Sequence, residues 1–390
     1  MERLRIGVVG AGPAGAYAAW QAARLGHEVM FFDHRAPWEK PCGGGITVKA
    51  QDDFPWIAEI ATLARGVIEF RFLSPEDRPL EFTCPRETLI FARGTLDEEI
   101  RKRAETAGAR RVKRKVQHVE RENGGWRLDA QGESQVVDFL VGADGAAGKT
   151  RERLVPDFHG YRRSIAAGFF IPADLDRIET KFFKDARGYL WFFPRPDHLS
   201  VGLCLWGGDG GEDAQGRETR VRLLQLLRTH FPALDPDTGK GYGAFIPTIT
   251  DPGCWKVDRG GRDWALVGDA GGFVDAITGE GIYYALKSAR AWGRALEAGR
   301  PETYDEEWRG EFGDELEKAS RLVHLYYKPA FIERVIGFGR ASRGIRTVMS
   351  DLVMGRQSYL TLRRRLQREI ARAGWRRLTG RPSRPRAARV

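Results

Sequence analysis

The chain has 390 residues, 42% of them hydrophobic, and a formal net charge of +10. This length allows one large or two to three smaller domains, and the apolar runs are too short for a transmembrane helix. Twelve arginines and a single acid, Glu369, fall in residues 356–390, so this tail accounts for the whole net charge. The near-neutral remainder argues against a nucleic-acid groove across the fold, and we expect no nucleic-acid partner.

The cysteines and the first residues of the chain predict the cellular compartment. The four cysteines, Cys42, Cys84, Cys204 and Cys254, show no C-x-x-C spacing. This pattern predicts reduced thiols and no metal site. The first strand pattern begins at residue 4 and leaves no room for a signal peptide. We therefore expect a cytoplasmic protein, with peripheral membrane attachment through the basic tail as a further hypothesis.

A nucleotide-binding signature opens the chain. Residues 4–9 form a short β-branched run, the glycine turn 10–15 follows, and an Ala-rich helical pattern covers 16–25. A second strand pattern, 28–32, ends on Asp33. This order of strand, glycine turn, helix, strand and acid is the βαβ dinucleotide fingerprint. The alternative is a glycine turn with a purely structural role.

Each residue type in the signature has a physical reason. Gly10 permits a tight turn, Gly12 lets the backbone approach a pyrophosphate, and Gly15 lets the helix pack against the strand. The helix N-terminus presents free N–H groups and its positive dipole end to phosphates. Asp33, 23 residues after Gly10, suits a ribose diol. The motif predicts a dinucleotide site without separating FAD from NAD.

Strand patterns dominate the next part of the chain. Strands are expected within 67–91, 112–121, 126–130, 136–141, 158–205 and 264–267. Helices are expected at 93–107, 221–229 and 281–298, and from there to the end with breaks at Pro301, Pro329 and Gly355. Because strand-rich segments interrupt the βαβ unit, we expect a Rossmann-like α/β nucleotide domain with an inserted antiparallel sheet.

This pattern predicts domain boundaries. The nucleotide domain is expected to take 1–65, 92–157 and 255–300. The β-sheet substrate domain is expected to take 66–91 and 158–254, and a helical C-terminal region 301–390.

Two further glycine-rich stretches have the composition of ligand-binding loops. Residues Lys40-Pro41-Cys42-Gly43-Gly44-Gly45 have few side chains, so a planar ligand fits against the backbone; the alternative is a flexible surface loop. Gly268-Asp269-Ala270 ends a strand pattern, and Gly279-Glu280-Gly281-Ile282 precedes a helix. The aspartate suits a ribityl hydroxyl, and the glycines let helix amides reach a pyrophosphate or a flavin ring edge.

The order of these motifs resembles the FAD-dependent family of p-hydroxybenzoate hydroxylase, flavin-dependent halogenases and geranylgeranyl reductases. Within it, the chain is most similar to the geranylgeranyl reductases. Residues 40–45 look like their flavin loop, 268–283 like their second flavin motif, and 189–194 like their aromatic cavity motif Y-x-W-x-F-P. Ala276 departs from the proline of the hydroxylases and halogenases, and Gly202-Leu203-Cys204 keeps only the first glycine of a G-x-G.

The resemblance and the motifs together name a cofactor site. The resemblance implies FAD contacts at Ala14, Asp33, Cys42, Gly43, Gly45, Arg93, Asp269, Gly281 and Ile282, with a backbone contact to adenine at Val116. The motifs add Gly10, Gly12, Gly15, Gly44 and Gly279. From the residues alone, Arg93 suits a phosphate; the alternative is an ordinary exposed arginine at a helix start.

Three residues are candidates for the chemistry. Cys42 is expected near the flavin, where a thiol can relay a proton; the alternative is a small residue tolerated in a tight loop. Tyr189 and Trp191 alternate with Phe193 along a strand and should share one face. The bland interpretation of that face is hydrophobic core. The resemblance implies instead the wall of a cavity for a prenyl chain, which offers nothing to hydrogen-bond.

The basic tail has a helical pattern of its own. Leu362, Leu366 and Ile370 recur at i, i+4 spacing among arginines in residues 357–378. A basic amphipathic helix of this kind is typical of docking on an anionic membrane. The alternatives are a helix packed on the body by that stripe and a docking site for an acidic electron-donor protein.

These features predict an FAD-dependent reductase that saturates C=C bonds of a geranylgeranyl or other prenyl chain on a lipid, quinone or chlorophyll precursor. The electron donor is expected to be NADPH or reduced ferredoxin. The main alternative is an FAD-dependent monooxygenase, or a halogenase, acting on an aromatic or polyketide substrate. A third interpretation is a flavin-bearing electron-transfer protein without alkene chemistry.

Overall fold

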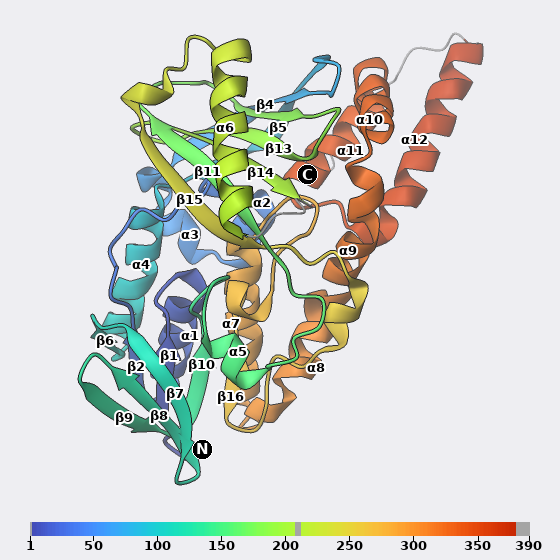
Figure 1. Ribbon diagram of the computed structural model, residues 1–390. Coiled ribbons are helices and arrows are strands. Elements are labelled where there is room, and N and C mark those ends of the chain that lie inside the picture. Colours follow the sequence, from blue (N-terminus) through green and yellow to red (C-terminus); the bar gives the residue numbers. More distant parts are fainter. Residues whose placement is uncertain (1, 207–211, 380–390) are drawn as a thin grey trace.

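The computed structural model describes residues 2–206 and 212–379, so the glycine loop at 207–211 and the end of the tail lie outside the described residues. A parallel five-stranded sheet in the order β16-β10-β1-β2-β6 forms one end of the molecule (Figure 1). Its strands are β1 (Arg5–Val9), β2 (Glu28–Phe32), β6 (Arg110–Val112), β10 (Phe139–Gly142) and β16 (Trp264–Leu266).

Both faces of this sheet are covered. Helices α1 (Pro13–Arg24), α4 (Arg93–Thr106) and α7 (Ile282–Glu297) pack together on one face. The antiparallel strands β7 (Val116–Glu122), β8 (Gly125–Ala130) and β9 (Glu133–Val137) cover the other. Successive side chains of β1 point to opposite faces of the sheet. Val8 therefore packs in the core under α1, and Val9 packs in the core under β8.

The second layer is an eight-stranded sheet in the order β15-β11-β14-β13-β12-β4-β5-β3. The strands are β3 (Gly45–Ile46), β4 (Arg65–Leu73), β5 (Pro79–Ile90), β11 (Arg163–Ile171), β12 (Ile178–Phe182), β13 (Arg187–Pro194), β14 (Leu199–Trp206) and β15 (Lys240–Pro247). All pairs are antiparallel except β12 with β4. Helix α6 (Glu212–His230) packs on the outer face (Figure 1).

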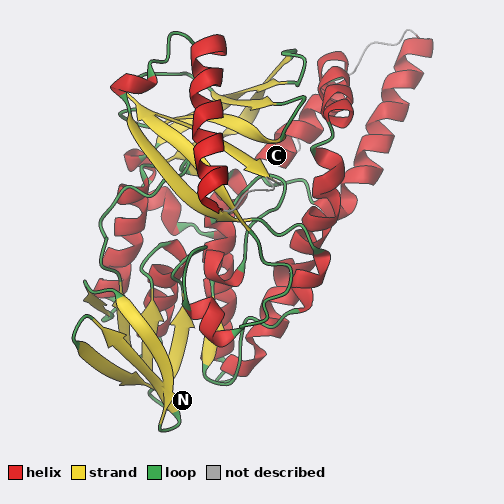
Figure 2. Cartoon of the chain, in the orientation of Figure 1, coloured by secondary structure: helices red, strands yellow, loops and turns green. Residues whose placement is uncertain are grey.

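The C-terminal helices stack along one side of both sheets (Figure 2). They are α8 (Tyr304–Trp308), α9 (Asp314–Tyr326), α10 (Pro329–Ala341), α11 (Arg343–Val353) and α12 (Tyr359–Thr379). The remaining helices are α2 (Val48–Asp53), α3 (Trp56–Glu59) and α5 (Thr150–Leu154), with 3-10 turns at Ala61–Leu63, Pro236–Thr238, Pro252–Lys256, Gly268–Gly271 and Pro301–Thr303 and a π-helical turn at Arg309–Gly313. Within the described residues, no helix is both long and apolar enough to cross a bilayer.

The predicted fold class is confirmed, while the domain boundaries stay a prediction. The single strand expected at 112–121 is wrong. Arg114 N–H donates to the Val112 carbonyl at 2.8 Å, and this tight turn ends β6 before β7 starts at Val116. The helix expected at 221–229 begins earlier, at Glu212, and an extra break falls at Ser342, whose side chain caps α11.

We expect Leu203→Ala to lower the free energy of unfolding by about 2–5 kcal/mol, because the change leaves a cavity. Leu203 is fully buried in the cluster that joins β14 to α6. Leu63→Ala is the control, since Leu63 is 42% exposed and should change stability by less than about 0.5 kcal/mol. Urea denaturation followed by circular dichroism measures both, and equal midpoints would contradict this packing of α6.

Candidate active site

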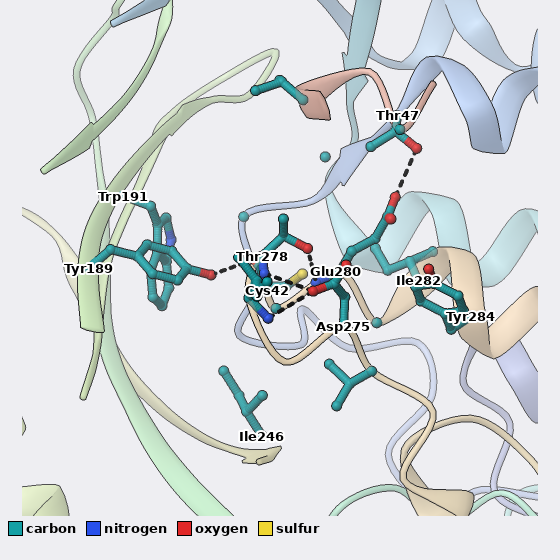
Figure 3. Close-up of a pocket in the computed structure, with 18 of the residues that line it drawn as sticks. Cys42, Thr47, Tyr189, Trp191, Ile246, Asp275, Thr278, Glu280, Ile282 and Tyr284 are labelled. Atoms are coloured by element: carbon teal, nitrogen blue, oxygen red, sulfur yellow. Dashed lines mark hydrogen bonds between the residues drawn. The ribbon is translucent and has the colours of Figure 1, made fainter. Parts of the chain in front are cut away.

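A cavity of about 390 Å³ runs from the glycine turn before α1 to the C-terminal helices. This volume is in the range of sites for small molecules and cofactors. One end is formed by the glycine turn, the loop 40–45 and the segment 279–282; the other is formed by β13 and by α9 to α12. In Figure 3, Tyr189 and Trp191 reach from their strand toward Thr278 and the Cys42 loop.

Close packing explains the glycines of the first turn. Gly10 has a φ of +105°, and a Cβ there would lie 2.3 Å from the Ala143 carbonyl oxygen. A Cβ on Gly15 would lie 1.9 Å from the Gly10 carbonyl oxygen. A Cβ on Gly12 would meet nothing within 4 Å. Gly10 and Gly15 therefore serve the protein's own packing, and Gly12 keeps open the space in front of α1.

Two helix N-termini border the same cavity without side-chain caps. Gly12 is the N-cap of α1 and Gly281 the N-cap of α7, and neither first turn contains an acid. The free N–H groups and positive dipole ends favour an anionic or carbonyl-bearing ligand at each helix. A dinucleotide with a pyrophosphate and a carbonyl-bearing ring system fits this pair of sites.

Carboxylates lie beside both helix ends. Asp33 accepts hydrogen bonds from Ala11 N at 3.4 Å and Arg35 N at 2.8 Å, which holds it next to the glycine turn. Asp269 pairs with Lys40 at 3.3 Å, so the segment that starts at Gly268 contacts the loop that carries Cys42. These positions suit hydroxyl groups of a ribose and a ribityl chain.

The cavity gathers most of the residues predicted from the sequence. Those that line it are Gly12, Ala14, Cys42, Gly43, Gly44, Gly45, Arg93, Tyr189, Trp191, Asp269, Gly279, Gly281 and Ile282. Gly10, Gly15 and Asp33 support the turn from behind or beside it. Val116 starts β7, pairs with Ala130 and does not border the cavity. The individual roles stay predictions.

Arg93 is buried and already paired. Its Nε and Nη2 donate to the two carboxylate oxygens of Asp97 at 2.9 and 2.8 Å. Burial lowers the pKa of Arg93, but the charge of Asp97 and the nearby Cys42 thiol outweigh it and raise that pKa. The guanidinium therefore stays charged beside Cys42, and its contact with a phosphate stays a prediction.

The aromatic strand and the glycine loop fit each other closely. A Cβ on Gly43 or Gly45 would lie 2.9 Å from the ring of Phe193. Tyr189 donates its hydroxyl to the Thr278 carbonyl at 2.8 Å, and burial raises the pKa of Tyr189. Tyr189, Trp191 and Phe193 all border the cavity, so the predicted shared face is present.

Two carboxylates, the buried Asp275 and the half-buried Glu280, are not among the predicted site residues. Asp275 accepts hydrogen bonds from Ile277 N at 2.7 Å and from the Tyr359 hydroxyl at 2.9 Å, and burial raises the pKa of Asp275. Glu280 accepts a hydrogen bond from Thr47 Oγ1 at 2.8 Å (Figure 3). It also accepts one from Lys49 Nζ at 3.1 Å. Glu280 stood within a recognised motif, whereas its partners and Tyr359 gave no local signal.

The far end of the cavity is apolar. The C-terminal helices contribute Tyr326, Tyr327, Phe331, Val335, Val348, Met349, Leu352, Val353, Leu362 and Leu366. Leu362 and Leu366 belong to the stripe on α12, so this part of the stripe faces the protein interior. Ile370 of the same stripe is 43% exposed. Of the three interpretations of α12, packing on the body therefore holds for its first turns.

Within the described residues, no group of three or more His, Cys, Asp or Glu side chains is placed to hold a metal ion. All four cysteines are free. Cys42 is half-buried, while Cys84, Cys204 and Cys254 are buried. Cys42 is thus the thiol among these four that a ligand in the cavity can reach.

Comparisons with known proteins agree with this geometry. Residues 8–50 match the NAD(P)-binding Rossmann-like domain family. The chain is 32% identical over 314 residues to the geranylgeranyl diphosphate reductase of Rhodobacter capsulatus, covering 75% of this chain and 76% of the relative. This chain belongs to the geranylgeranyl reductase family. It is an FAD-dependent oxidoreductase.

Two further members and neighbours of the geranylgeranyl reductase family extend the match. Digeranylgeranylglycerophospholipid reductase 2 of Methanopyrus kandleri is 28% identical over 356 residues, covering 82% of this chain and 85% of that relative. The crystal structure of a geranylgeranyl bacteriochlorophyll reductase-like protein from Thermoplasma acidophilum superposes with a TM-score of 0.73 at 20% identity, covering 95% of this chain and 100% of that chain. The structural match shows the shared fold.

We expect Gly12→Ala to weaken FAD binding at least tenfold, while the FAD-free protein stays folded and loses only the stability of a glycine N-cap. The added methyl meets no protein atom but enters the space before α1. Gly310→Ala is the matched control, because a Cβ there also meets nothing within 4 Å and lies in the π-helical turn. Fluorescence titration with FAD measures the dissociation constants. Equal affinities in the two variants would contradict a phosphate site at this helix end.

Proposed function

We propose that this member of the geranylgeranyl reductase family saturates C=C bonds of a prenyl chain carried by a lipid, quinone or chlorophyll precursor. The observation that carries the proposal is the lining of the cavity, which extends from the Cys42 loop to apolar side chains of the C-terminal helices. An apolar wall with few polar groups suits a hydrocarbon chain. The names of the relatives, which include a diphosphate and a phospholipid reductase, support this substrate class.

The chain holds the cofactor through backbone groups and carboxylates. The N-terminus of α1 suits the pyrophosphate, Asp33 the adenosine ribose and Asp269 the ribityl chain. The loop 43–45 and the N-terminus of α7 would then contact the flavin ring system. When bound, FAD in its reduced form supplies hydride to the alkene.

The protein residues at the cavity supply the proton and exclude water. An isolated alkene accepts hydride poorly. A proton must therefore be delivered to one alkene carbon as the hydride reaches the other. The Cys42 thiol lies on the cavity wall and is the proposed donor of this proton, and the guanidinium of Arg93 beside it would balance the thiolate that remains. Tyr189, Trp191 and the apolar helices exclude solvent from this end of the cavity.

The electrons come from NADPH or reduced ferredoxin in this proposal. The chain carries one dinucleotide fingerprint, so NADPH would bind transiently. Anaerobic mixing of the holoenzyme with each donor, followed by the bleaching of flavin absorbance, identifies the one that reduces it. Bleaching by neither donor would contradict both assignments.

We expect the reduced holoenzyme, incubated without oxygen with a geranylgeranylated lipid, to add two hydrogens to each double bond it reduces. The physical reason is that each saturation consumes one hydride and one proton. Mass spectrometry of the extracted lipid measures the gain. An oxygen-dependent gain of an oxygen atom would contradict the reductase and favour a monooxygenase.

We also propose that α12 attaches the enzyme to an anionic membrane. Its outer surface exposes Arg363, Arg364 and Arg368, and Leu360 and Ile370 are 53% and 43% exposed. The first leucines of the stripe on the same helix line the apolar cavity, so the proposed lipid-binding surface and the cavity share one helix. Basic residues next to an anionic surface each contribute about 1 kcal/mol of binding.

Removing three of these charges, in Arg363→Gln/Arg364→Gln/Arg368→Gln, should weaken binding to phosphatidylglycerol vesicles about 100-fold, from about 1 kcal/mol per residue. The matched control removes three exposed arginines elsewhere, Arg187, Arg217 and Arg228, and should bind as the wild type. Vesicle co-sedimentation measures both. Unchanged vesicle binding with slower reduction by ferredoxin would assign the patch to the donor protein instead.

A further inference from the structure

The loop that carries Cys42 is held by side chains of the eight-stranded sheet. The Cys42 carbonyl accepts hydrogen bonds from Ser200 Oγ at 2.9 Å and from Arg195 Nη2. Ser200 is fully buried and Arg195 is 1% exposed. Two buried donors on one carbonyl restrict the peptide unit of Cys42, because leaving either donor unpaired in the interior is costly.

The same arginine connects the loop to α4. Arg195 Nη1 pairs with Glu39, which lies three residues before Cys42. The carboxylate oxygens of Glu39 also accept from Arg93 N at 2.9 Å and Gly94 N at 2.8 Å, the first residues of α4. Glu39 therefore caps α4 and neutralises the buried guanidinium of Arg195 at the same time. The loop is tied to the sheet and to the helix by one network.

The glycines after Cys42 cannot fix the loop by themselves. They have no side chains, and Gly44 has a φ of +85° with a Cβ position 2.1 Å from the Phe91 carbonyl oxygen. The ring of Phe193 lies under Gly43 and Gly45. Phe193 gives the loop a surface but no directional contact, so the directional restraint comes from the hydrogen bonds to Cys42.

We propose that Arg195 and Ser200 are positioning residues that hold Cys42 in one place on the cavity wall. Arg195 directly follows β13, the strand that carries the cavity-lining aromatic residues, and Ser200 lies at the start of β14. The turn between these strands thus sets where the thiol of the cofactor loop stands relative to the substrate. The identity of the reaction rests on the proposed function, whereas the restraint on Cys42 does not.

The test compares Ser200→Ala and Arg195→Lys with two controls in the FAD-loaded enzyme. Ser164→Ala removes another buried serine of the same sheet, bonded to Thr248, and Arg187→Lys changes an exposed arginine of β13. The rate of alkylation by iodoacetamide is read for each cysteine by mass spectrometry. Visible circular dichroism of the bound flavin reports the loop independently of activity.

In Ser200→Ala we expect Cys42 to be alkylated about five times faster. This factor corresponds to the loss of one hydrogen bond of about 1 kcal/mol. Arg195→Lys should raise the rate at least as much, because lysine lacks the second arm that reaches Glu39. The rates at Cys84 and Cys254 and both control variants should stay as in the wild type. An unchanged rate at Cys42 in both variants, or an equal rise at Cys84 and Cys254, would overturn the proposal.

Turnover separates this inference from the proposed function. With a prenyl lipid that the wild type reduces, we expect the variants to lower kcat with little change in KM. If the wild type reduces no prenyl lipid but alkylation of Cys42 responds as expected, the proposed reaction fails and the positioning stands. If both variants reduce the lipid at the wild-type kcat and their alkylation rate at Cys42 is unchanged, the positioning fails and the reaction stands.

Discussion

The contact between the first strand, the first helix and β10 sets the geometry of the cofactor end. Gly15 of α1 lies so near the Gly10 carbonyl that no side chain fits between them, and Ala143 closes over Gly10 from the end of β10. Three chain segments therefore meet around one glycine turn. This contact directs the free N-terminus of α1 into the cavity, where its N–H groups remain unpaired by the protein.

The Cys42 loop is almost bare of side chains and is still held in one conformation. Its glycines remove the side chains, and its order comes from groups supplied by other elements. Phe193 underlies the loop, Arg195 and Ser200 hold its carbonyl, and Glu39 joins it to α4. The nucleotide domain and the second sheet are thus coupled at Cys42, on the wall of the cavity.

The C-terminal helices give the second sheet a cavity instead of a solvent-exposed face. Their apolar side chains extend the cavity away from the glycine loops, and Leu362 and Leu366 of α12 close its outer side. The start of α12 is held by two hydrogen bonds to the protein interior. The Tyr359 hydroxyl donates to Asp275, and the Tyr359 backbone N–H donates to Glu315 at 2.7 Å. One helix therefore shields the apolar end of the cavity and exposes arginines on its outer face.

The features that could be predicted from the sequence depend on residues that are close together in the chain. The glycine fingerprint, Asp33 and the two later glycine motifs each lie within a few tens of residues, so the rules of βαβ geometry predict the fold class and the cofactor end directly. The aromatic strand was equally visible, because alternate residues of a strand share a face.

Tertiary structure alone decided the contacts between distant segments. The sequence gives no signal that Arg195 reaches Cys42, that Tyr359 reaches Asp275, or that the leucines of α12 face inward instead of toward a bilayer. An amphipathic pattern states that one face is apolar but not what covers it. These pairs form only after the two sheets and the C-terminal helices have docked, and that docking depends on packing across the whole core, which no local pattern records.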